Sequence, residues 1–275
     1  MSFFVEQLTF RIGGATLLRD VSLELAAHEL VAVVGPNGAG KTTLIRALAG
    51  DIRPSNGTVS LDGRSLEQWP ATELARRRAV MRSGSAVAFG FTTREVALMG
   101  RLPTHGGDPS DGDRDLVDAL LHAVDCAGLA DRVLATLSDG ERQRVQLARA
   151  LALVSPASGV RDPFDNDGDR FLLLDEPTSS LDPAHQHGAM RLLRHEVDGG
   201  CGVLVVLHDL NLAAAYADRI VLMKDAGVIA SGAPDEMLRP DLLERVFDIA
   251  MLVVRHPASA HPLIVARPDH RPSLP

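Results

Sequence analysis

A short glycine-rich stretch has the residue types and the spacing needed to bind phosphate. Residues 35–42 read GPNGAGKT and match the pattern G-x-x-x-x-G-K-[ST], between an apolar run and an apolar-periodic segment. Its glycines allow a tight turn that directs backbone N–H groups towards phosphate oxygens, and the positive end of the following helix adds to that field. Lys41, one of two lysines in the chain, supplies a compact ammonium that suits β- and γ-phosphates better than a planar guanidinium. Thr42 is expected to coordinate Mg²⁺.

Two neighbouring carboxylates stand at the end of another apolar run. FLLLDE (171–176) is four apolar residues followed by Asp175 and Glu176, and alternation along a strand sends these two side chains to different sides. We predict that Asp175 holds Mg²⁺ through water and that Glu176 faces an attacking water as general base. Acids at the end of a strand often simply begin a loop, and it is the phosphate-binding stretch that favours the catalytic interpretation.

Three histidines are candidates for chemistry. His208 comes directly after the apolar run GVLVVL. A strand-end histidine is often structural, but here it could contact the γ-phosphate and the attacking water. His185 and His187 lie two residues apart on a predicted helix, so their rings do not share a face and no metal site is expected there. The predicted catalytic residues are therefore Glu176, His208 and Lys41.

A helix is predicted to begin within TLSDGERQRVQ (136–146). Ser138 can cap it, and Glu141 three residues later completes the Ser-x-x-Glu pattern of a capping box. Taken alone, the stretch is an ordinary helix start in which Asp139 adds a negative charge. Its meaning depends on the other motifs of the chain.

The elements that must position these residues alternate between short β-rich runs and helical patterns, which indicates an α/β fold around a mainly parallel sheet. Three continuous apolar runs are typical of strands buried on both faces: 30–34, 171–174 and 203–207. Polar residues follow each run, and ligands bind at such carboxyl ends in open α/β sheets. The first thirty residues and residues 57–61 predict shorter, alternating strands that form an antiparallel flank.

The middle of the chain, from about residue 83 to 155, is mostly helical in pattern apart from a polar loop at 105–113, and it predicts a helical subdomain inserted between two strands of the core sheet. A turn-rich loop, PASGVRDPFDNDG (156–168), follows it. The acidic part of this loop resembles half of a calcium loop, but the spacing is wrong and no glutamate closes it. The Pro- and His-rich chain beyond Arg255 is predicted to be a loosely held end.

Composition limits the classes of function. A chain of 275 residues with 45% hydrophobic content can bury a substantial core, and a net charge of −8 without a Lys/Arg-rich run argues against nucleic acid as a partner. Cys126 and Cys201 fit no metal spacing, so we expect reduced thiols. MSFFVEQLTF lacks the features of a signal peptide, and no aliphatic run approaches the ~20 residues of a membrane span. We expect a soluble intracellular chain whose membrane role depends on a partner.

The motifs together resemble those of one family. The phosphate loop, LSDGE, the apolar-DE run, SSLD (179–182) and the strand-end histidine are similar to those of the ATP-binding subunits of ABC transporters, over nearly the whole chain. The resemblance implies a P-loop NTPase fold in a single ATP-binding domain, with a core of residues 1–82 and 160–255, a helical subdomain of about 83–159 and a tail of 256–275. It implies ATP and Mg²⁺ as cofactors, with ATP bound by Gly35, Pro36, Asn37, Gly38, Ala39, Gly40, Lys41, Thr42 and Thr43.

In that family, a signature of the form LSGGQ or LSGGE binds the γ-phosphate of the ATP held by the opposite subunit. The resemblance gives this role to Ser138, Asp139, Gly140 and Glu141. It also implies a head-to-tail homodimer in which two ATP molecules lie between phosphate loop and signature. Ser180 and Asp182 would belong to the loop that crosses between the two sites.

Longer segments resemble the haem-import members of the family, which group with the importers of iron–siderophore complexes and cobalamin. These segments are 88–101, 145–151, 174–187, 208–220 and 256–265. The resemblance implies ATP hydrolysis that drives haem through two copies of an integral membrane permease, fed by a periplasmic haem-binding protein, at the cytoplasmic face of the cell inner membrane. Siderophore or cobalamin import and a non-transport nucleotide switch are the alternatives, and a single cassette without a heptad run favours transport.

Three positions depart from the family pattern. Glycine is usual where this chain has Asp139. The glutamine of the loop that senses Mg²⁺ and the permease is absent, and Ser83 is its nearest equivalent and a further candidate ligand of Mg²⁺. The aromatic residue that often stacks on adenine aligns with Ile12; Phe10 is a possible substitute, although core packing is the simpler interpretation of both. These departures affect coupling and dimer closure rather than the hydrolytic residues.

Overall fold

The computed structural model describes residues 2–83, 90–103, 108–155 and 169–267 of the chain. The acidic loop at 156–168 and the polar residues 104–107 therefore lie outside the described residues, as do the first two residues of the segment 88–101. In the part that is described, no helix is both long and apolar enough to cross a membrane.

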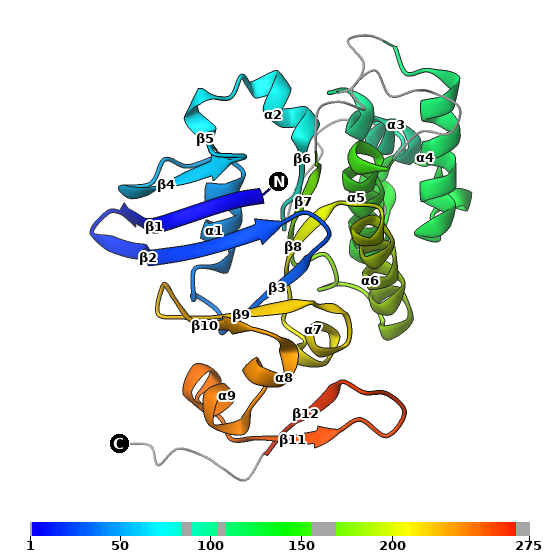
Figure 1. Ribbon diagram of the computed structural model, residues 1–275. Coiled ribbons are helices and arrows are strands. Elements are labelled where there is room, and N and C mark those ends of the chain that lie inside the picture. Colours follow the sequence, from blue (N-terminus) through cyan, green and yellow to red (C-terminus); the bar gives the residue numbers. More distant parts are fainter. Residues whose placement is uncertain (1, 84–89, 104–107, 156–168, 268–275) are drawn as a thin grey trace.

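A six-stranded, mainly parallel sheet forms the centre of the molecule (Figure 1), as predicted. Its strand order is β10-β9-β3-β8-β7-β6, and only β10 runs antiparallel to its neighbour. The bounds are β3 (Leu30–Val34), β6 (Arg78–Met81), β7 (Phe171–Asp175), β8 (Gly202–Val206), β9 (Arg219–Lys224) and β10 (Gly227–Gly232). Every residue of β3, β7 and β8 is buried, which explains their apolar sequences; Asp175, at the end of β7, is the charged exception.

The predicted antiparallel flank is a second, four-stranded sheet with the order β2-β1-β4-β5. Its strands are β1 (Ser2–Ile12), β2 (Ala15–Ala26), β4 (Asn56–Leu61) and β5 (Arg64–Ser65). β1 and β2 have 11 and 12 residues, so they are longer than the sequence pattern suggested. The ring of Phe3 meets that of Phe171 edge to face at 4.9 Å between centroids, which joins this sheet to the core sheet.

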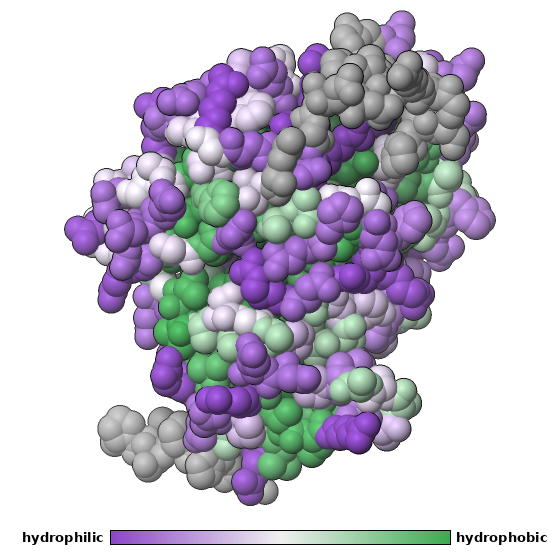
Figure 2. All heavy atoms as spheres, viewed as in Figure 1, coloured by the Kyte–Doolittle hydropathy of each residue, from purple (hydrophilic) through white to green (hydrophobic). Residues whose placement is uncertain are grey.

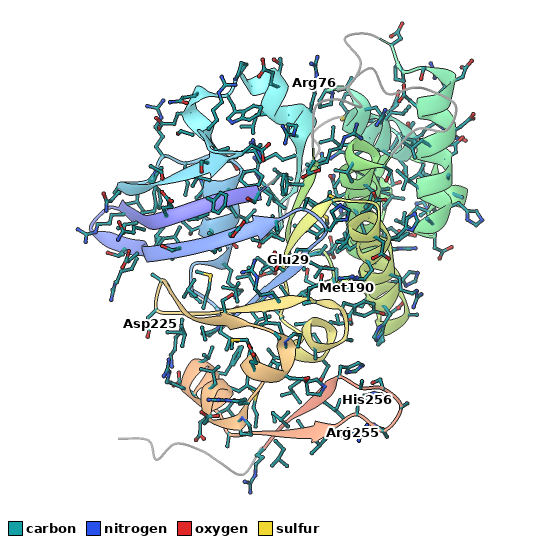
Figure 3. All side chains as sticks on the ribbon, viewed as in Figure 1. Glu29, Arg76, Met190, Asp225, Arg255 and His256 are labelled. Carbon is teal, nitrogen blue, oxygen red and sulfur yellow. The ribbon has the colours of Figure 1, made fainter. Side chains whose placement is uncertain are left out.

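The two faces of the core sheet contribute to two separate apolar clusters. Along β3, Val31 and Val33 share a cluster with the antiparallel sheet, α1 (Lys41–Leu48) and Leu74 of α2 (Ala71–Arg77), whereas Leu30, Ala32 and Val34 share the other cluster with helices that follow β6 in the chain. This is the period-two alternation of a strand, and both sides are apolar because both are covered. Figure 3 shows Met190, a fully buried residue of α6, and Glu29, which pairs with Arg219 at 2.7 Å beside the start of β9.

The helices cover both faces of the core sheet, and three of the described helices come between the adjacent strands β6 and β7 in the sequence. Their bounds are α1 (Lys41–Leu48), α2 (Ala71–Arg77), α3 (Thr93–Leu98), α4 (Asp111–Ala123), α5 (Asp139–Val154), α6 (Pro183–Asp198), α7 (Leu210–Tyr216), α8 (Pro234–Met237) and α9 (Pro240–Phe247). Short 3-10 helices lie at Leu66–Gln68, Met99–Arg101, Ala127–Leu129 and Leu134–Thr136.

We call the described part of the chain between β6 and β7 the helical insert; it contains α3, α4 and α5 and lies beside the core sheet (Figure 1). A buried ion pair holds it together, because Arg101 Nε donates to Asp113 Oδ1 at 2.7 Å and Arg101 Nη1 donates to the carbonyl oxygen of Ala152. The exact division of the chain into a core and a helical subdomain stays a prediction.

The prediction of a loosely held end beyond Arg255 is wrong for residues 256–267. β11 (Met251–Arg255) and β12 (Pro262–Ala266) pair as an antiparallel hairpin. The Asn211 side chain of α7 bonds both the N–H and the carbonyl of Ile264, at 2.8 and 3.2 Å, and Ile264 is buried. The apolar run PLIV explains the difference, since it has a strand pattern and a surface to pack on. Figure 2 shows apolar surface over this hairpin, where Leu252, Val254 and Val265 are exposed.

Candidate active site

The glycine-rich stretch connects the end of β3 to the start of α1, as a phosphate loop requires. Gly38 and Gly40 have φ angles of +80° and +99°, a region that side chains with a Cβ rarely adopt. A Cβ on Gly35 would lie 2.1 Å from the carbonyl oxygen of Met223, so this position has no room for one. The loop borders a cavity of about 200 Å³, which we call the phosphate cavity after this loop. It is lined by Leu17, Glu176 and residues 37–43.

Lys41 lies inside this loop and is nearly buried. Its Nζ donates to the carbonyl oxygens of Gly35 and Pro36 at 2.8 and 2.9 Å, which holds the ammonium under the loop. Burial lowers the pKa of Lys41, and the carboxylates of Glu176 and Asp175 act in the opposite direction. The ammonium therefore faces both the phosphate cavity and the two acids at the end of β7.

Oxygen atoms from three elements converge at Asp175. This carboxylate ends β7 and is 1% exposed. Its Oδ1 accepts from Thr42 Oγ1 at 3.3 Å, and its Oδ2 accepts from Ser83 Oγ at 2.9 Å. One carboxylate and two hydroxyls form the hard-oxygen donor set that suits Mg²⁺, and water normally completes it. The structure brings all three predicted residues together; their role as metal ligands stays a prediction.

Glu176 and His208, the predicted base and its companion, touch each other. Glu176 Oε1 lies 2.6 Å from His208 Nε2, and Glu176 also lines the phosphate cavity. The backbone of Glu176 leaves the strand with a φ of +54°, an unusual value for a residue other than glycine. Directly after His208, the Asp209 side chain caps α7 by accepting from the N–H groups of Asn211 and Leu212. These local constraints fix both groups at the carboxyl end of the sheet.

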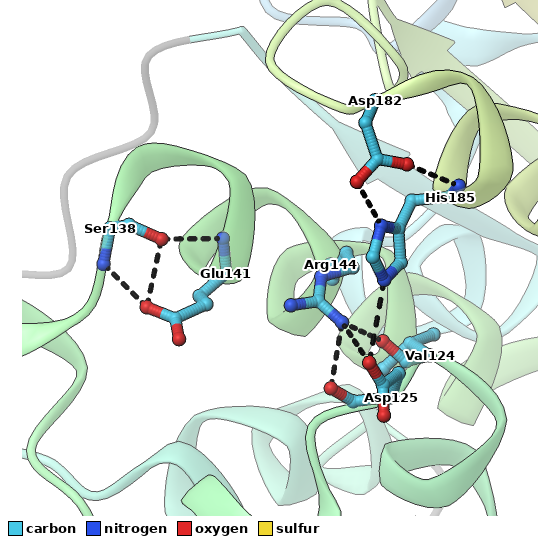
Figure 4. Close-up of polar contacts among 7 residues, drawn as sticks. All are labelled: Val124, Asp125, Ser138, Glu141, Arg144, Asp182 and His185. Carbon is cyan, nitrogen blue, oxygen red and sulfur yellow. Dashed lines mark hydrogen bonds and ion pairs between the residues drawn. The ribbon is translucent and has the colours of Figure 1, made fainter.

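The signature stretch begins α5 with a complete capping box (Figure 4). Ser138 Oγ accepts from the N–H of Glu141 at 3.3 Å, while Glu141 Oε2 accepts from the N–H and the hydroxyl of Ser138 at 2.7 and 2.8 Å. These bonds from Ser138 lower the pKa of Glu141. Asp139, whose side chain is 80% exposed, forms an ion pair with Arg142 one turn later. The ordinary helix start expected from this stretch alone is thus present.

The loop of residues 179–182, which we call the crossing loop, lies against the signature of its own chain. A Cβ on Gly140 would be 2.9 Å from the carbonyl oxygen of Ser180. The Gln143 side chain donates to the carbonyl of Glu176 at 2.5 Å and accepts from the N–H of Ser180 at 2.9 Å. Sequence reasoning missed Gln143, although an amide one turn after Asp139, on the same face of the helix, was a usable signal.

The signature and the phosphate cavity do not form one site within the chain. No signature residue lines the cavity, and among the described residues no hydrogen bond or ion pair joins residues 138–141 to residues 35–43. The signature stretch and the phosphate loop thus lie at two separate places in the described part of the chain.

Phe10 and Ile12, the two candidates for stacking on adenine, differ in burial. Phe10 packs against the cluster between the antiparallel sheet and the core sheet, as the core-packing interpretation predicted. The same interpretation is wrong for Ile12, which is 61% exposed. The strand pairing of β1 shifts between Phe10 and Arg11, so the simple two-residue alternation fails there.

The remaining candidates agree with a structural role. His185 contacts Asp182 and Asp125, whereas His187 contacts the hydroxyl of Tyr216, so the two rings diverge as predicted. Cys126 and Cys201 are free and buried, and burial raises the pKa of both thiols, that of Cys126 to about 11. Within the part of the chain that is described, no group of three His, Cys, Asp or Glu side chains is arranged to hold a metal.

Comparison with known proteins places this geometry in context. The family model described as ABC transporter matches residues 18–157. The hemin import ATP-binding protein of Gloeobacter violaceus is 48% identical over 93% of this chain and 90% of its own length. The protein of the same name from Pseudomonas aeruginosa is 46% identical over 96% and 99%. The dimeric structure of a bacterial ABC transporter cassette superposes with a TM-score of 0.72 at 25% identity, covering 84% of this chain and 98% of that one.

Proposed function

We propose, from the premise that the chain belongs to the ABC transporter family, that it is the ATPase subunit that energises import of haem through a membrane permease. The observation that carries the proposal is the convergence of the phosphate loop, Asp175 and the Glu176–His208 pair around one cavity. The relatives are named as hemin import proteins, and this supports haem as the cargo.

The residues at the cavity have complementary tasks in hydrolysis. The loop N–H groups and Lys41 bind and orient the phosphates, and Lys41 offsets their charge. Thr42 and Asp175, together with Ser83, are the groups that would hold Mg²⁺, which neutralises phosphate charge when bound. Glu176 accepts a proton from the water whose oxygen attacks the γ-phosphorus. The bond from that phosphorus to the oxygen bridging the β- and γ-phosphates breaks, and ADP and inorganic phosphate leave. His208 keeps the Glu176 carboxylate in place through their contact of 2.6 Å.

The assembly is proposed to be a head-to-tail homodimer. Each subunit carries a phosphate cavity and a separate signature, so two copies facing each other would complete two ATP sites. A relative whose structure is described as dimeric has the same fold. Two copies of an integral membrane permease and a periplasmic haem-binding protein complete the proposed importer. The subunit would then be peripheral, at the cytoplasmic face of the cell inner membrane.

The test of this function is reconstitution. The subunit is co-expressed with its candidate permease, and the complex is placed in vesicles with the periplasmic binding protein. Loading the binding protein with haem should stimulate ATP hydrolysis, whereas loading it with an iron–siderophore complex or cobalamin should not. If only one of the other two ligands stimulates hydrolysis, that ligand, and not haem, is the cargo. A subunit that hydrolyses ATP but never co-purifies with a permease would indicate a non-transport switch.

A further inference from the structure

The imidazole of His185 lies between two carboxylates that belong to different parts of the molecule (Figure 4). Its Nδ1 is 2.8 Å from Asp182 Oδ2 in the crossing loop, and its Nε2 is 3.4 Å from Asp125 Oδ2 in the helical insert. His185 itself is in the first turn of α6, which packs on the core sheet. A single ring therefore bridges the crossing loop and the insert.

Both carboxylates are held in place by further polar contacts. Asp182 caps α6, since its Oδ1 accepts from the N–H of His185 at 3.0 Å. Asp125 is fixed by Arg144 of α5, whose Nη1 donates to the backbone carbonyls of Val124 and Asp125 at 2.9 and 2.7 Å and to Asp125 Oδ2 at 3.3 Å. Among the described residues, Asp182 and Asp125 are the charged groups bonded to the ring, and Arg144 is bonded to Asp125. The pocket beside the ring is otherwise lined by apolar residues and a glycine.

The protonation state of the ring decides whether both contacts attract. Ionised carboxylates only accept hydrogen bonds, and a neutral imidazole has one N–H, so it can satisfy one partner and turns a lone pair towards the other. The doubly protonated ring donates to both. Histidines gain that second proton in mildly acidic solution. The bridge between crossing loop and insert is therefore complete only with the imidazolium form.

The other end of the crossing loop is tied to the same insert through Gln143, which bonds the N–H of Ser180 and the carbonyl of Glu176. Gln143 and Arg144 are consecutive residues of α5. One helix of the insert thus controls both ends of the loop, at Ser180 directly and at Asp182 through Asp125 and His185. The first of these connections leads straight to the predicted general base.

We propose that His185 is a positioning residue for ATP hydrolysis, which ties the crossing loop to the helical insert through Asp125 so that the loop moves with the insert. This inference rests on the proposed ATPase function. The ring touches neither ATP nor the attacking water; it acts through the loop that leads back to Glu176.

The test compares four proteins: wild type, His185→Gln, Asp125→Asn and the double variant. ATPase activity of the assembled importer is measured from about pH 5.5 to 8.5, the interval in which histidines titrate. His185→Gln should lower activity about two- to fivefold at the acidic end, as expected for one partly exposed ion pair. The difference should fade towards the alkaline end, and ATP affinity should not change. His187→Gln is the matched control, because it removes a histidine from the same helix outside the bridge.

Urea unfolding of the same proteins measures the bridge without ATP turnover. The proposal is supported if the double variant loses no more activity than either single variant. It also requires that the two substitutions are coupled in the free energy of unfolding at pH 6 and that this coupling disappears at pH 8. Additive effects, or a wild-type to His185→Gln ratio that is constant with pH, would overturn it. If wild type hydrolyses no ATP while the unfolding coupling persists, the proposed function fails and the bridge stands as a structural contact only.

Discussion

Replacing Asp139 by glycine should tighten the ATP-bound dimer, although it weakens the subunit itself. Asp139 is the first residue of α5, between two positions that would meet the partner's γ-phosphate, and its carboxylate is 80% exposed. It pairs with Arg142 in its own helix. A negative charge is thus fixed at the rim of the face that a second ATP would approach.

The opposing free energies can be estimated from this geometry. In the monomer, an acid in the first turn contributes about 0.3–1 kcal/mol, and a helical ion pair about 0.2–0.5 kcal/mol. Two like charges ~8 Å apart repel by about 2 kcal/mol at an effective dielectric constant of 20. Arg142 offsets part of this repulsion and salt screens a further part. We therefore estimate a net repulsion of about 1 kcal/mol per ATP site. That corresponds to roughly fivefold in affinity at each site.

The assay measures ATP-dependent dimerisation of the Asp139→Gly variant by analytical ultracentrifugation, together with ATPase activity, at several ionic strengths. We expect tighter dimerisation and faster turnover, with the largest gain at low salt. Asp111→Gly is the matched control. Asp111 is likewise the first residue of a helix with a capping box, is fully exposed and faces an arginine one turn later. It should reproduce the loss of helix stability without the gain in dimerisation.

Electrostatic repulsion by Asp139 is refuted if Asp139→Gly dimerises no better than wild type at any salt concentration. It is also refuted if Asp111→Gly gives the same gain, because the effect would then come from helix stability. The first result would mean that the ion pair with Arg142 keeps the carboxylate away from the phosphate, and that the stretch works as an ordinary signature.

Three further variants test the remaining assignments. Lys41→Ala should abolish ATP binding or turnover, because among the described residues no other side chain donates to the two loop carbonyls that Lys41 holds. Normal hydrolysis would contradict the phosphate-loop assignment. Glu176→Gln should still bind ATP but accumulate as a closed dimer, which size-exclusion chromatography detects, and wild-type turnover would exclude Glu176 as base. Ser83→Gln should increase permease-stimulated ATPase and make dimer closure more dependent on Mg²⁺, since the longer amide reaches beyond the 2.9 Å contact with Asp175; an unchanged or lower rate would count against the alignment.

The sequence was most informative about features that are decided by residues close together in the chain. The apolar runs at 30–34 and 171–174 are buried strands because only a strand covered on both faces needs such a pattern. Gly38 and Gly40 are required by their positive φ angles, which follow from the motif, whereas the close approach of the Met223 carbonyl to Gly35 is a contact with a distant strand. Asp175, Thr42 and Ser83 converge because the ends of β6 and β7 and the start of α1 meet at one edge of the sheet.

Features that depend on contacts between distant elements could not be predicted. The hairpin beyond Arg255 is ordered by Asn211 of α7, and nothing in the residues 256–267 alone identifies that partner. Ile12 is exposed because the pairing of β1 shifts beside it, and a shift of register leaves no mark in an alternating sequence. The buried pair of Arg101 and Asp113 was equally hidden. The sequence placed Asp113 in a polar loop at 105–113, whereas α4 already begins at Asp111, and charged residues are normally expected to face solvent.

The signature stretch shows why a structural and a functional interpretation need not exclude each other. Ser138 and Glu141 satisfy each other completely in the capping box, so the stretch is a well-formed helix start without any ligand. A capping box uses only the N–H groups of the first and fourth residues, however, and a helix start leaves further N–H groups without intrahelical partners. Those of Asp139 and Gly140 belong to this set, and Gly140 has no side chain to cover them. The capping box therefore fixes the helix end while leaving backbone donors and the positive end of the helix dipole available to a phosphate, which in the proposed homodimer would belong to the ATP of the partner subunit.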